Sequence, residues 1–181
     1  PLKLSTVSRL DEGQVDHAWL SDRDRPVIVA VGRLVRAKNF PLLIEAFGLL
    51  RAQREARLII VGDGEERRAL QQLAQASPYG NDIELVGHRD NPYPYMRAAD
   101  LFVMSSSWEG FGNVLVEAMC LGTSIVSTDC PHGPREILED GRLGRLVAVD
   151  DAAALSDAMH HSLDAPTPPA VLREAATRFD I

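Results

Sequence analysis

Short, continuous apolar runs alternate with longer segments of mixed polarity along most of the chain. Six such runs, the last of them edge-like, predict strands at residues 27–31, 57–61, 83–86, 101–104, 124–128 and 144–147. The segments between and after them favour helices, at residues 41–53, 65–76, 94–99, 113–121, 133–138, 150–163 and 168–179. This alternation predicts an α/β fold, a doubly wound parallel six-stranded sheet that is Rossmann-like, with helices on both faces.

The first 25 residues do not follow this alternation. They carry mixed charges and little periodicity, apart from a stretch at residues 2–7 that predicts a short strand. We interpret residues 1–25 as a linker or edge segment and residues 26–181 as one Rossmann-like domain. A chain of 181 residues is long enough for a single well-packed core, and two complete domains would be cramped.

Composition excludes several classes of protein. Hydrophobic residues make up 45% and charged residues 25%, which is typical of a globular domain. The net charge of −7 argues against nucleic acid as the main partner, because phosphate backbones are bound by basic faces. No apolar run approaches the ~20 residues that span a bilayer. The two cysteines, Cys120 and Cys130, lack metal-binding or redox spacing, which favours a reducing, cytoplasmic setting.

The turns that follow the predicted strands carry the candidate chemistry. They lie at residues 32–33, 62–64, 87–88, 109–112 and 131–134, and parallel strands bring such turns to one edge of the sheet. Arg33 directly follows the glycine that ends the first strand, and Lys38 comes five residues later. A guanidinium can hold a phosphate with two hydrogen bonds while an ammonium adds a point charge. We interpret Arg36, between them, as a surface residue.

A second set of anion donors follows the fourth strand. Gly110 and Gly112 lie in a turn before the helix that begins near Asn113, and the first N–H groups of a helix attract anions. Glu109 precedes this turn and Glu117 follows it, eight positions later. Taken alone, Glu109 reads as an ordinary exposed loop carboxylate, and Glu117 reads as a buried residue paired with an arginine. Together with the phosphate donors, they predict a diphosphate ligand with hydroxyl-rich groups at both ends, such as a nucleotide-sugar.

These residues resemble a known family. Glu109-Gly110-Phe111-Gly112 with Glu117-Ala118-Met119 resembles the Glu-x7-Glu signature of the retaining, GT-B-fold glycosyltransferases of family 4, also called group 1. The resemblance covers residues 15–179 and includes, in order, the segments at residues 32–40, 61–64, 86–87, 99–101 and 133–137. Each segment alone is weak, whereas their order and spacing together are specific.

The resemblance implies a role for each candidate residue. Arg33 and Lys38 would hold the donor diphosphate, Glu109 would be the catalytic residue at the transferred sugar, and Glu117 would bind the ribose. The base would lie against Gly87 and His88, although His88 also reads as a merely exposed histidine. The other donor-binding residues would be Gly32, Gly110, Phe111, Gly112, Asn113 and Val114. No cofactor or bound metal is implied, because the cations and the helix N-terminus would stabilise the leaving diphosphate.

A complete GT-B enzyme has two Rossmann-like domains, and this chain has the length of one. We therefore expect the donor-binding half of an enzyme that transfers a hexosyl group, from a UDP-sugar by preference, in bacterial polysaccharide or glycoconjugate synthesis. The N-terminal acceptor domain would be missing and the isolated fragment inactive. The resemblance allows the full-length enzyme to associate peripherally with the inner face of the plasma membrane.

Other functions stay open at this point. A GT-B-fold epimerase or phosphorylase would share the pocket but not the reaction, and a non-catalytic nucleotide-sugar-binding domain would keep only the binding. A dinucleotide oxidoreductase is disfavoured, because Gly-Arg-Leu-Val at residues 32–35 replaces the Gly-x-Gly-x-x-Gly turn.

Overall fold

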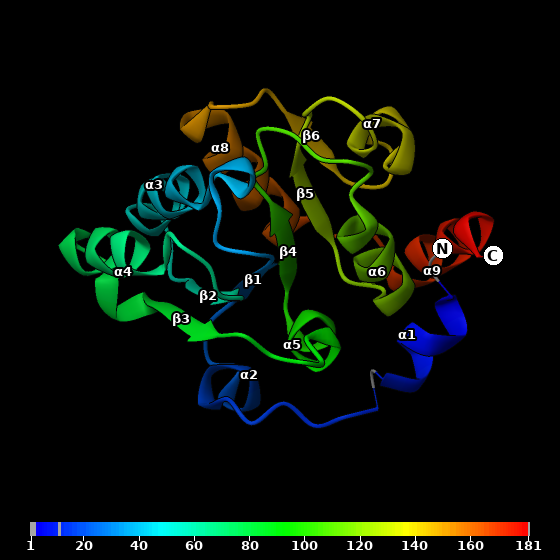
Figure 1. Cartoon of the computed structure of the whole chain (residues 1–181), viewed down its shortest axis with the longest axis horizontal. Coiled ribbons are helices and arrows are strands. Elements are labelled where there is room, and N and C mark those ends of the chain that lie inside the picture. Colours follow the sequence, from blue (N-terminus) through cyan, green and yellow to red (C-terminus); the bar gives the residue numbers. More distant parts are fainter. Residues whose placement is uncertain (1–2, 11, 181) are drawn as a thin grey trace.

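A computed structural model describes residues 3–10 and 12–180, and it confirms the α/β fold. A parallel six-stranded sheet in the order β3-β2-β1-β4-β5-β6 forms the middle layer (Figure 1). The strands are β1 (Val27–Val31), β2 (Arg57–Val61), β3 (Ile83–Gly87), β4 (Leu101–Met104), β5 (Ile125–Thr128) and β6 (Arg145–Val147). Strand order reverses between β1 and β4, so the loops after these two strands meet at the point where such sheets bind ligands.

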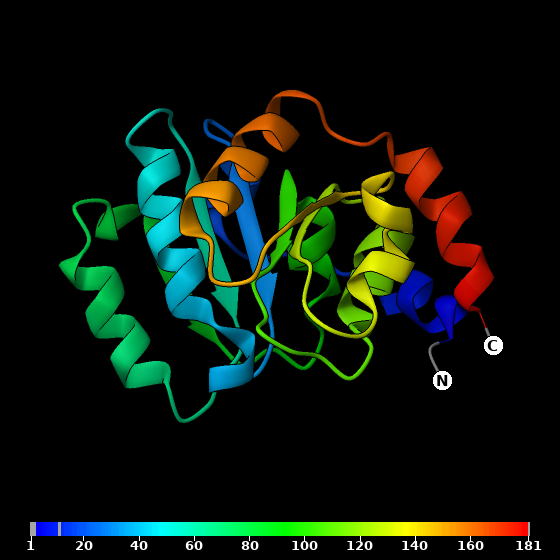
Figure 2. The same cartoon turned by 90° about the horizontal axis from the view of Figure 1, so that it is seen from above.

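Helices cover both faces of the sheet (Figure 2). One layer packs against the core cluster that contains Ile28 and Ile60, and it consists of α3 (Phe40–Arg51), α4 (Arg67–Ala76) and α8 (Ala152–Asp164). The opposite core cluster contains Val29 and Phe102. It is covered by α1 (Leu4–Leu10), α2 (Ala18–Asp22), α5 (Tyr93–Ala98), α6 (Asn113–Leu121), α7 (Pro134–Ile137) and α9 (Pro169–Ala176). Alternate residues of each strand thus supply the two cores.

Four short 3₁₀ helices complete the described part of the chain. They are η1 (Arg36–Lys38), η2 (Gly80–Asp82), η3 (Glu139–Gly141) and η4 (Thr177–Phe179). The first of these shapes the turn after β1 and so sets the position of Lys38. Among the residues that the structure describes, no helix is both long enough and apolar enough to cross a bilayer.

The predicted strand at residues 2–7 is wrong. The described part of this segment begins helix α1, and Leu2 lies outside the described residues. Leu4 and Val7 are buried and three positions apart, so a helix places both on one face, against α6. The run was too short for its helical period to be distinguished from alternation. Helix α1 also meets the other end of the described chain, where the N–H of Leu4 donates to Oδ1 of Asp180 at 3.1 Å.

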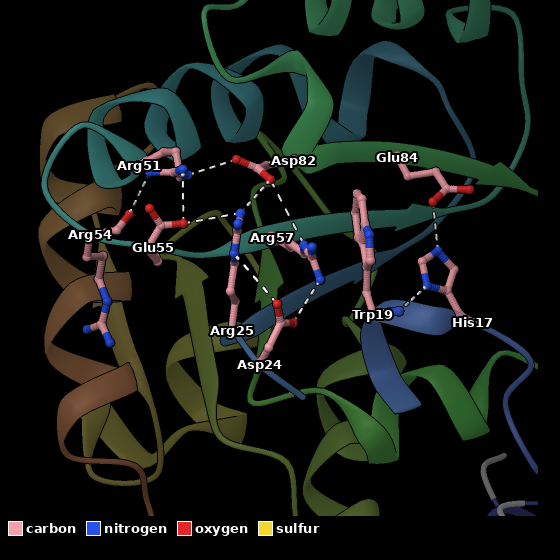
Figure 3. Close-up of polar contacts among 10 residues, drawn as sticks. All are labelled: His17, Trp19, Asp24, Arg25, Arg51, Arg54, Glu55, Arg57, Asp82 and Glu84. Carbon is pink, nitrogen blue, oxygen red and sulfur yellow. Dashed lines mark hydrogen bonds and ion pairs between the residues drawn. The ribbon is translucent and has the colours of Figure 1, made fainter. Parts of the chain in front are cut away.

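Residues 17–25 are fixed to the amino-terminal edge of the sheet by polar contacts (Figure 3). Nε2 of His17 lies 2.7 Å from a carboxylate oxygen of Glu84 on β3. The guanidinium of Arg57 lies over the ring of Trp19, 5.0 Å from its centroid. Arg25 reaches Asp82, which Arg51 also binds. These contacts lie at the opposite edge from the turns that carry the candidate chemistry, so they support the sheet and leave that edge free.

Candidate functional site

The turns after β1 and β2 interlock at the carboxyl-terminal edge of the sheet. Gly62 has φ +150°, and a Cβ atom there would lie 1.9 Å from the carbonyl oxygen of Gly32. Leu34 donates its N–H to the carbonyl of Asp63 at 2.9 Å, and Glu66 donates to the carbonyl of Leu34 at 3.0 Å. Only a residue without a side chain allows this approach, so the glycines fix the floor of the site.

A hollow of about 240 Å³ opens above these turns. Arg33 and His88 both line it, and both side chains are exposed. Among the residues that the structure describes, none forms an ion pair with Arg33. The full lining is Val31, Gly32, Arg33, Val61, Gly62, Asp63, His88, Arg89 and Pro92. The hollow therefore offers an available guanidinium at the place where the sequence predicts the diphosphate.

The wall after β3 is held by Arg89. Its Nη1 donates to the carbonyl oxygens of Val86 at 2.7 Å and His88 at 2.9 Å, and its Nε donates to the hydroxyl of Tyr95 at 3.3 Å. The imidazole of His88 lies 3.0 Å from Asp90 and is 70% exposed. The loop backbone is thus fixed beneath an exposed histidine.

Asp63 places a carboxylate in the same hollow. Hydrogen bonding from the N–H of Gly64 at 2.8 Å, and then from Arg67, lowers the pKa of Asp63 against the opposing effect of desolvation. The carboxylate is therefore ionised at neutral pH, and both of its oxygens already have donors. This pairing limits its repulsion of an anionic ligand.

A second, smaller hollow contains Lys38 and Glu109. Nζ of Lys38 donates to Oε1 of Glu109 at 2.5 Å, and the hydroxyl of the buried Ser106 donates to the same oxygen at 2.6 Å. No described residue bonds Oε2 of Glu109. Val31 lines both hollows, so the two are adjacent. The arrangement holds one carboxylate oxygen and leaves the other for a ligand.

Hydrogen bonds between the loops after β1 and β4 maintain this arrangement. Ser105 donates its hydroxyl to the carbonyl of Lys38 at 2.9 Å, and Ser107 donates its N–H to the carbonyl of Ala37 at 2.9 Å. From β5, the hydroxyl of Thr128 donates to the carbonyl of Ser106 at 2.6 Å. Cys130 lies nearby, and burial, with a smaller effect of Glu109, raises the pKa of its thiol. A thiol that resists ionisation fits the structural role expected of this cysteine.

The glycine-rich turn places the N-terminus of helix α6 at the same edge of the sheet. Gly112 precedes the helix with φ +93°, and the loop after β5 packs so closely that a Cβ on Gly133 would lie 1.6 Å from the carbonyl oxygen of Phe111. Within the described part of the chain, the N–H groups of Asn113 and Val114 donate no hydrogen bond. These N–H groups and the positive end of the helix dipole are available to an anion.

Glu117 is a half-buried residue of α6 and lines neither hollow. Burial raises its pKa, and a hydrogen bond from the hydroxyl of Tyr93 offsets part of that rise. Burial, followed by the charge and the hydrogen bond of Glu117, raises the pKa of Tyr93 to about 12. At neutral pH Tyr93 therefore stays protonated, so its hydroxyl is the hydrogen-bond donor and the carboxylate is the acceptor.

The structure brings most of the predicted residues together, but not all into one cavity. Gly32, Arg33 and His88 line the first hollow, and Lys38, Glu109 and Val114 line the second. Gly110, Gly112 and Asn113 form the turn and helix start beside them. A Cβ on Gly87 would lie 3.3 Å from the guanidinium of Arg67, and the ring of Phe111 packs against Phe179 with centroids 5.9 Å apart. Neither of these two residues, nor Glu117, lines either hollow.

Three residues of the site were not predicted from the sequence. Ser106 donates to Glu109, Tyr93 lowers the raised pKa of Glu117, and Asp63 lines the first hollow. Ser106 and Asp63 each lie in a turn after a predicted strand, which is a signal that could have found them. Tyr93 has no such signal, because its contact depends on how two helices pack.

Comparison with known proteins gives a consistent result. Residues 12–179 match the family described as Glycosyl transferases group 1. The chain is 39% identical over 146 residues to the lipopolysaccharide core biosynthesis glycosyltransferase LpsE of Rhizobium meliloti, covering 80% of this chain and 42% of that protein. It is 34% identical over 137 residues to an N-acetylgalactosamine-N,N'-diacetylbacillosaminyl-diphospho-undecaprenol 4-alpha-N-acetylgalactosaminyltransferase of Campylobacter jejuni, covering 76% and 37%.

A solved structure agrees with the sequence matches. HepE of Anabaena in complex with UDP-glucose superposes with a TM-score of 0.80 at 25% identity, over 99% of this chain and 52% of that one. The chain spans less than half the length of the two curated relatives and about half of the solved chain.

Proposed function

The chain belongs to the group 1 glycosyl transferases, and from that premise we propose that it is the donor-binding half of a retaining glycosyltransferase. The observation that carries the proposal is the meeting of Arg33, Lys38, Glu109 and the start of α6 at one edge of the sheet. This edge combines donors for a diphosphate with a carboxylate whose second oxygen faces no protein donor. Retention of the anomeric configuration is the part of the proposal that the Glu-x7-Glu resemblance supports.

In this proposal the donor lies across the two adjacent hollows. The diphosphate contacts Arg33, Lys38 and the N–H groups of Asn113 and Val114. These groups neutralise the negative charge that develops on the diphosphate as its bond to the sugar breaks. In this proposal these groups stabilise that charge without a metal ion or a cofactor. Glu109 faces the transferred sugar through Oε2, since Lys38 and Ser106 hold Oε1.

The relatives support a class of donor and a type of pathway. HepE was solved with UDP-glucose, and LpsE is named for the synthesis of the lipopolysaccharide core. We therefore favour a UDP-hexose as donor and bacterial polysaccharide or glycoconjugate synthesis as the process. A domain outside the 181 residues would bind the acceptor, because the relatives are more than twice as long as their matching segments. The reaction would take place in the cytoplasm, where nucleotide-sugars are made, at the inner face of the plasma membrane.

A ligand panel tests the binding part of the proposal. Thermal unfolding of the 181-residue chain is measured with UDP-, GDP- and ADP-sugars, because a ligand at about 100 times its Kd stabilises the fold by about 2.7 kcal/mol. We expect a UDP-sugar to raise the Tm most. Arg33→Ala should abolish the rise, whereas Arg36→Ala should retain it, since Arg36 is an exposed cation of the same loop that lines neither hollow.

Absence of stabilisation by every nucleotide-sugar would contradict the proposal. An equal loss of the ligand-induced rise in Tm in Arg33→Ala and Arg36→Ala would also contradict it. Transfer is measured separately, with the longer protein and with this chain, and we expect only the longer protein to transfer sugar. Transfer by the 181-residue chain alone would show that the acceptor site does not need a further domain.

A further inference from the structure

Phe111 joins the glycine-rich turn before α6 to the last helical segment that the structure describes. It follows Glu109 by two positions, and it lines neither hollow. Its ring is 36% exposed and packs edge-on against the ring of Phe179, with centroids 5.9 Å apart. Phe179 belongs to η4, which directly follows α9 and lies 68 positions later in the sequence. The turn is therefore in contact with η4.

Arg178, the neighbour of Phe179, binds the C-terminal end of α7. Its guanidinium lies over the ring of Phe179, 4.5 Å from the centroid. Nη2 of Arg178 donates to the carbonyl oxygens of Glu136 at 2.9 Å and Ile137 at 2.8 Å. Nη1 donates to Oε1 of Glu139 at 2.6 Å. The last carbonyl groups of a helix lack a full set of partners within it, and a cation suits the negative end of its dipole. Arg178 thus holds α7 next to η4.

Helix α7 also touches the glycine-rich turn. A Cβ on Gly133, the residue before α7, would lie 1.6 Å from the carbonyl oxygen of Phe111. A Cβ on Gly112 would lie 3.8 Å from the side chain of the last residue of α7. The backbone of the turn therefore packs against α7, and the ring of Phe111 packs against Phe179. Because Arg178 contacts both α7 and Phe179, it connects the two supports of the turn.

We propose that Arg178 and Phe179 are positioning residues for donor binding: they hold the glycine-rich turn so that the first N–H groups of α6 face the diphosphate. The inference rests on the proposed function and adds two residues that line neither hollow. A turn that is ordered before the ligand arrives spares the ligand the cost of ordering it. The contacts of η4 therefore strengthen binding of the phosphate groups. They do not affect the nucleoside, which in the proposed function lies against the loop after β3.

The alternative is that Arg178 and Phe179 only stabilise the fold as a whole. The two roles differ in which backbone N–H groups exchange faster with solvent when a contact is removed. The N–H of Leu115 donates to the carbonyl of Gly112 at 2.9 Å and reports on the turn. The N–H of Phe102 donates to the carbonyl of Ser124 at 2.8 Å, in the middle of the sheet, and reports on the fold. A general loss of stability raises both rates equally.

The test uses Arg178→Ala and Phe179→Ala in the 181-residue chain. Arg142→Ala is the matched control, because Nε of Arg142 donates to the same carboxylate, that of Glu139, at 2.6 Å. Within the described part of the chain, the Arg142 guanidinium binds neither α7 nor Phe179. Hydrogen exchange followed by NMR gives the rates of the two reporter N–H groups. Calorimetry gives the Kd of UDP, GDP and ADP and of the nucleoside of the tightest binder, and thermal unfolding confirms that each variant is folded.

In both test variants we expect the exchange rate at Leu115 to rise about tenfold more than the rate at Phe102. The Kd of the nucleoside diphosphate should rise about tenfold, the size of ordering a rotamer-rich side chain on binding. The Kd of the nucleoside should change less than twofold, and Arg142→Ala should match the wild type in every measurement. Equal rises at the two reporter positions would overturn the inference. Wild-type affinity for the nucleoside diphosphate, or the same losses in Arg142→Ala, would also overturn it.

The outcomes separate this inference from the proposed function. If the wild-type chain binds none of the three nucleoside diphosphates, the proposed function fails and the inference fails with it. If the wild type binds and Arg33→Ala abolishes binding, while Arg178→Ala and Phe179→Ala bind as the wild type does, only the role of these last two residues is wrong.

Discussion

Lys38 and Glu109 lie 71 positions apart in the sequence, and the ammonium nitrogen of one is 2.5 Å from a carboxylate oxygen of the other. Both side chains are largely buried, with 23% and 10% of their surface exposed. The contact joins the turn after β1 to the turn after β4, where the order of strands in the sheet reverses. Ser106 donates to the same oxygen as Lys38, so two protein donors hold Oε1 of Glu109 and none of the described residues holds Oε2.

Removing the charge of Glu109 should affect transfer and not folding. We expect Glu109→Gln in the longer protein to lower kcat about a hundredfold or more, the usual loss when one group that stabilises transition-state charge is removed. The measurement is the rate of sugar transfer from a saturating donor. Glu45→Gln is the matched control, because Glu45 is exposed on α3 and lines neither hollow. Transfer by Glu109→Gln at the rate of Glu45→Gln would refute a catalytic role.

Lys38 should matter for phosphate and not for the nucleoside. Lys38→Met removes one charge-assisted hydrogen bond donor, so we expect the Kd of UDP to rise at least about tenfold. Uridine lacks phosphate and should bind the variant and the wild type equally well. Calorimetry with both ligands measures this difference, and Arg36→Met controls for the loss of a cation two residues earlier. Equal weakening of UDP and uridine would mean that Lys38 only supports the fold.

The accuracy of the sequence-based predictions depended on the kind of contact. The strands were predicted because a parallel sheet buried on both faces requires continuous apolar runs, and the residue after each run must then lie at the same edge. Arg33 and Glu109 reached that edge for this reason alone. The hydrogen bonds of Ser106 and Tyr93 depend on the packing of whole elements, which local pattern does not encode.

The same limit applies to the segment before the first strand. Trp19 stacks under the guanidinium of Arg57, and His17 contacts Glu84. The conformation of this segment therefore depends on partners 38 and 67 positions away in the sequence. Its own sequence has little periodicity, and the predicted strand at residues 2–7 is helical where the structure describes it.

The ion-pair network at the opposite edge of the sheet should contribute to stability (Figure 3). Asp82, with 13% of its side chain exposed, accepts from Arg25 at 3.1 Å and from Arg51 at 2.9 Å. Asp82→Asn removes the less exposed of the two carboxylates that Arg25 and Arg51 share, and leaves them with Glu55, which is 59% exposed. We expect the free energy of unfolding to fall by about 2 kcal/mol, less than for a fully buried pair because the arginines are partly exposed.

Urea denaturation of the 181-residue chain measures the effect of Asp82→Asn. Asp164→Asn is the matched control, since Asp164 is 60% exposed and binds Arg54 at 2.8 Å. An exposed ion pair contributes at most about 1 kcal/mol, and we expect about 0.5 kcal/mol or less here. Equal losses in the two variants would show that the network around Asp82 is no stronger than a surface ion pair.

Glu117 should make the stability of the fold depend on pH. Burial raises its pKa in the folded state above the ordinary value of a glutamate, which is about 4.3. The folded state therefore binds the proton more tightly than the unfolded state. The stability linked to this proton is fully present below the ordinary pKa, and it is lost as pH rises through the raised pKa of the folded state.

Glu117→Gln removes this titration, so it should leave stability unchanged at low pH and increase the free energy of unfolding at neutral pH. Tyr93→Phe should act in the opposite sense, because it removes the hydrogen bond that lowers the pKa of Glu117. Urea denaturation at a series of pH values measures both differences. A Glu117→Gln variant that is less stable than the wild type at neutral pH would contradict the expectation. A more stable variant that binds UDP less tightly would show that the wild-type chain gives up stability to keep an ionised carboxylate ready for the ligand.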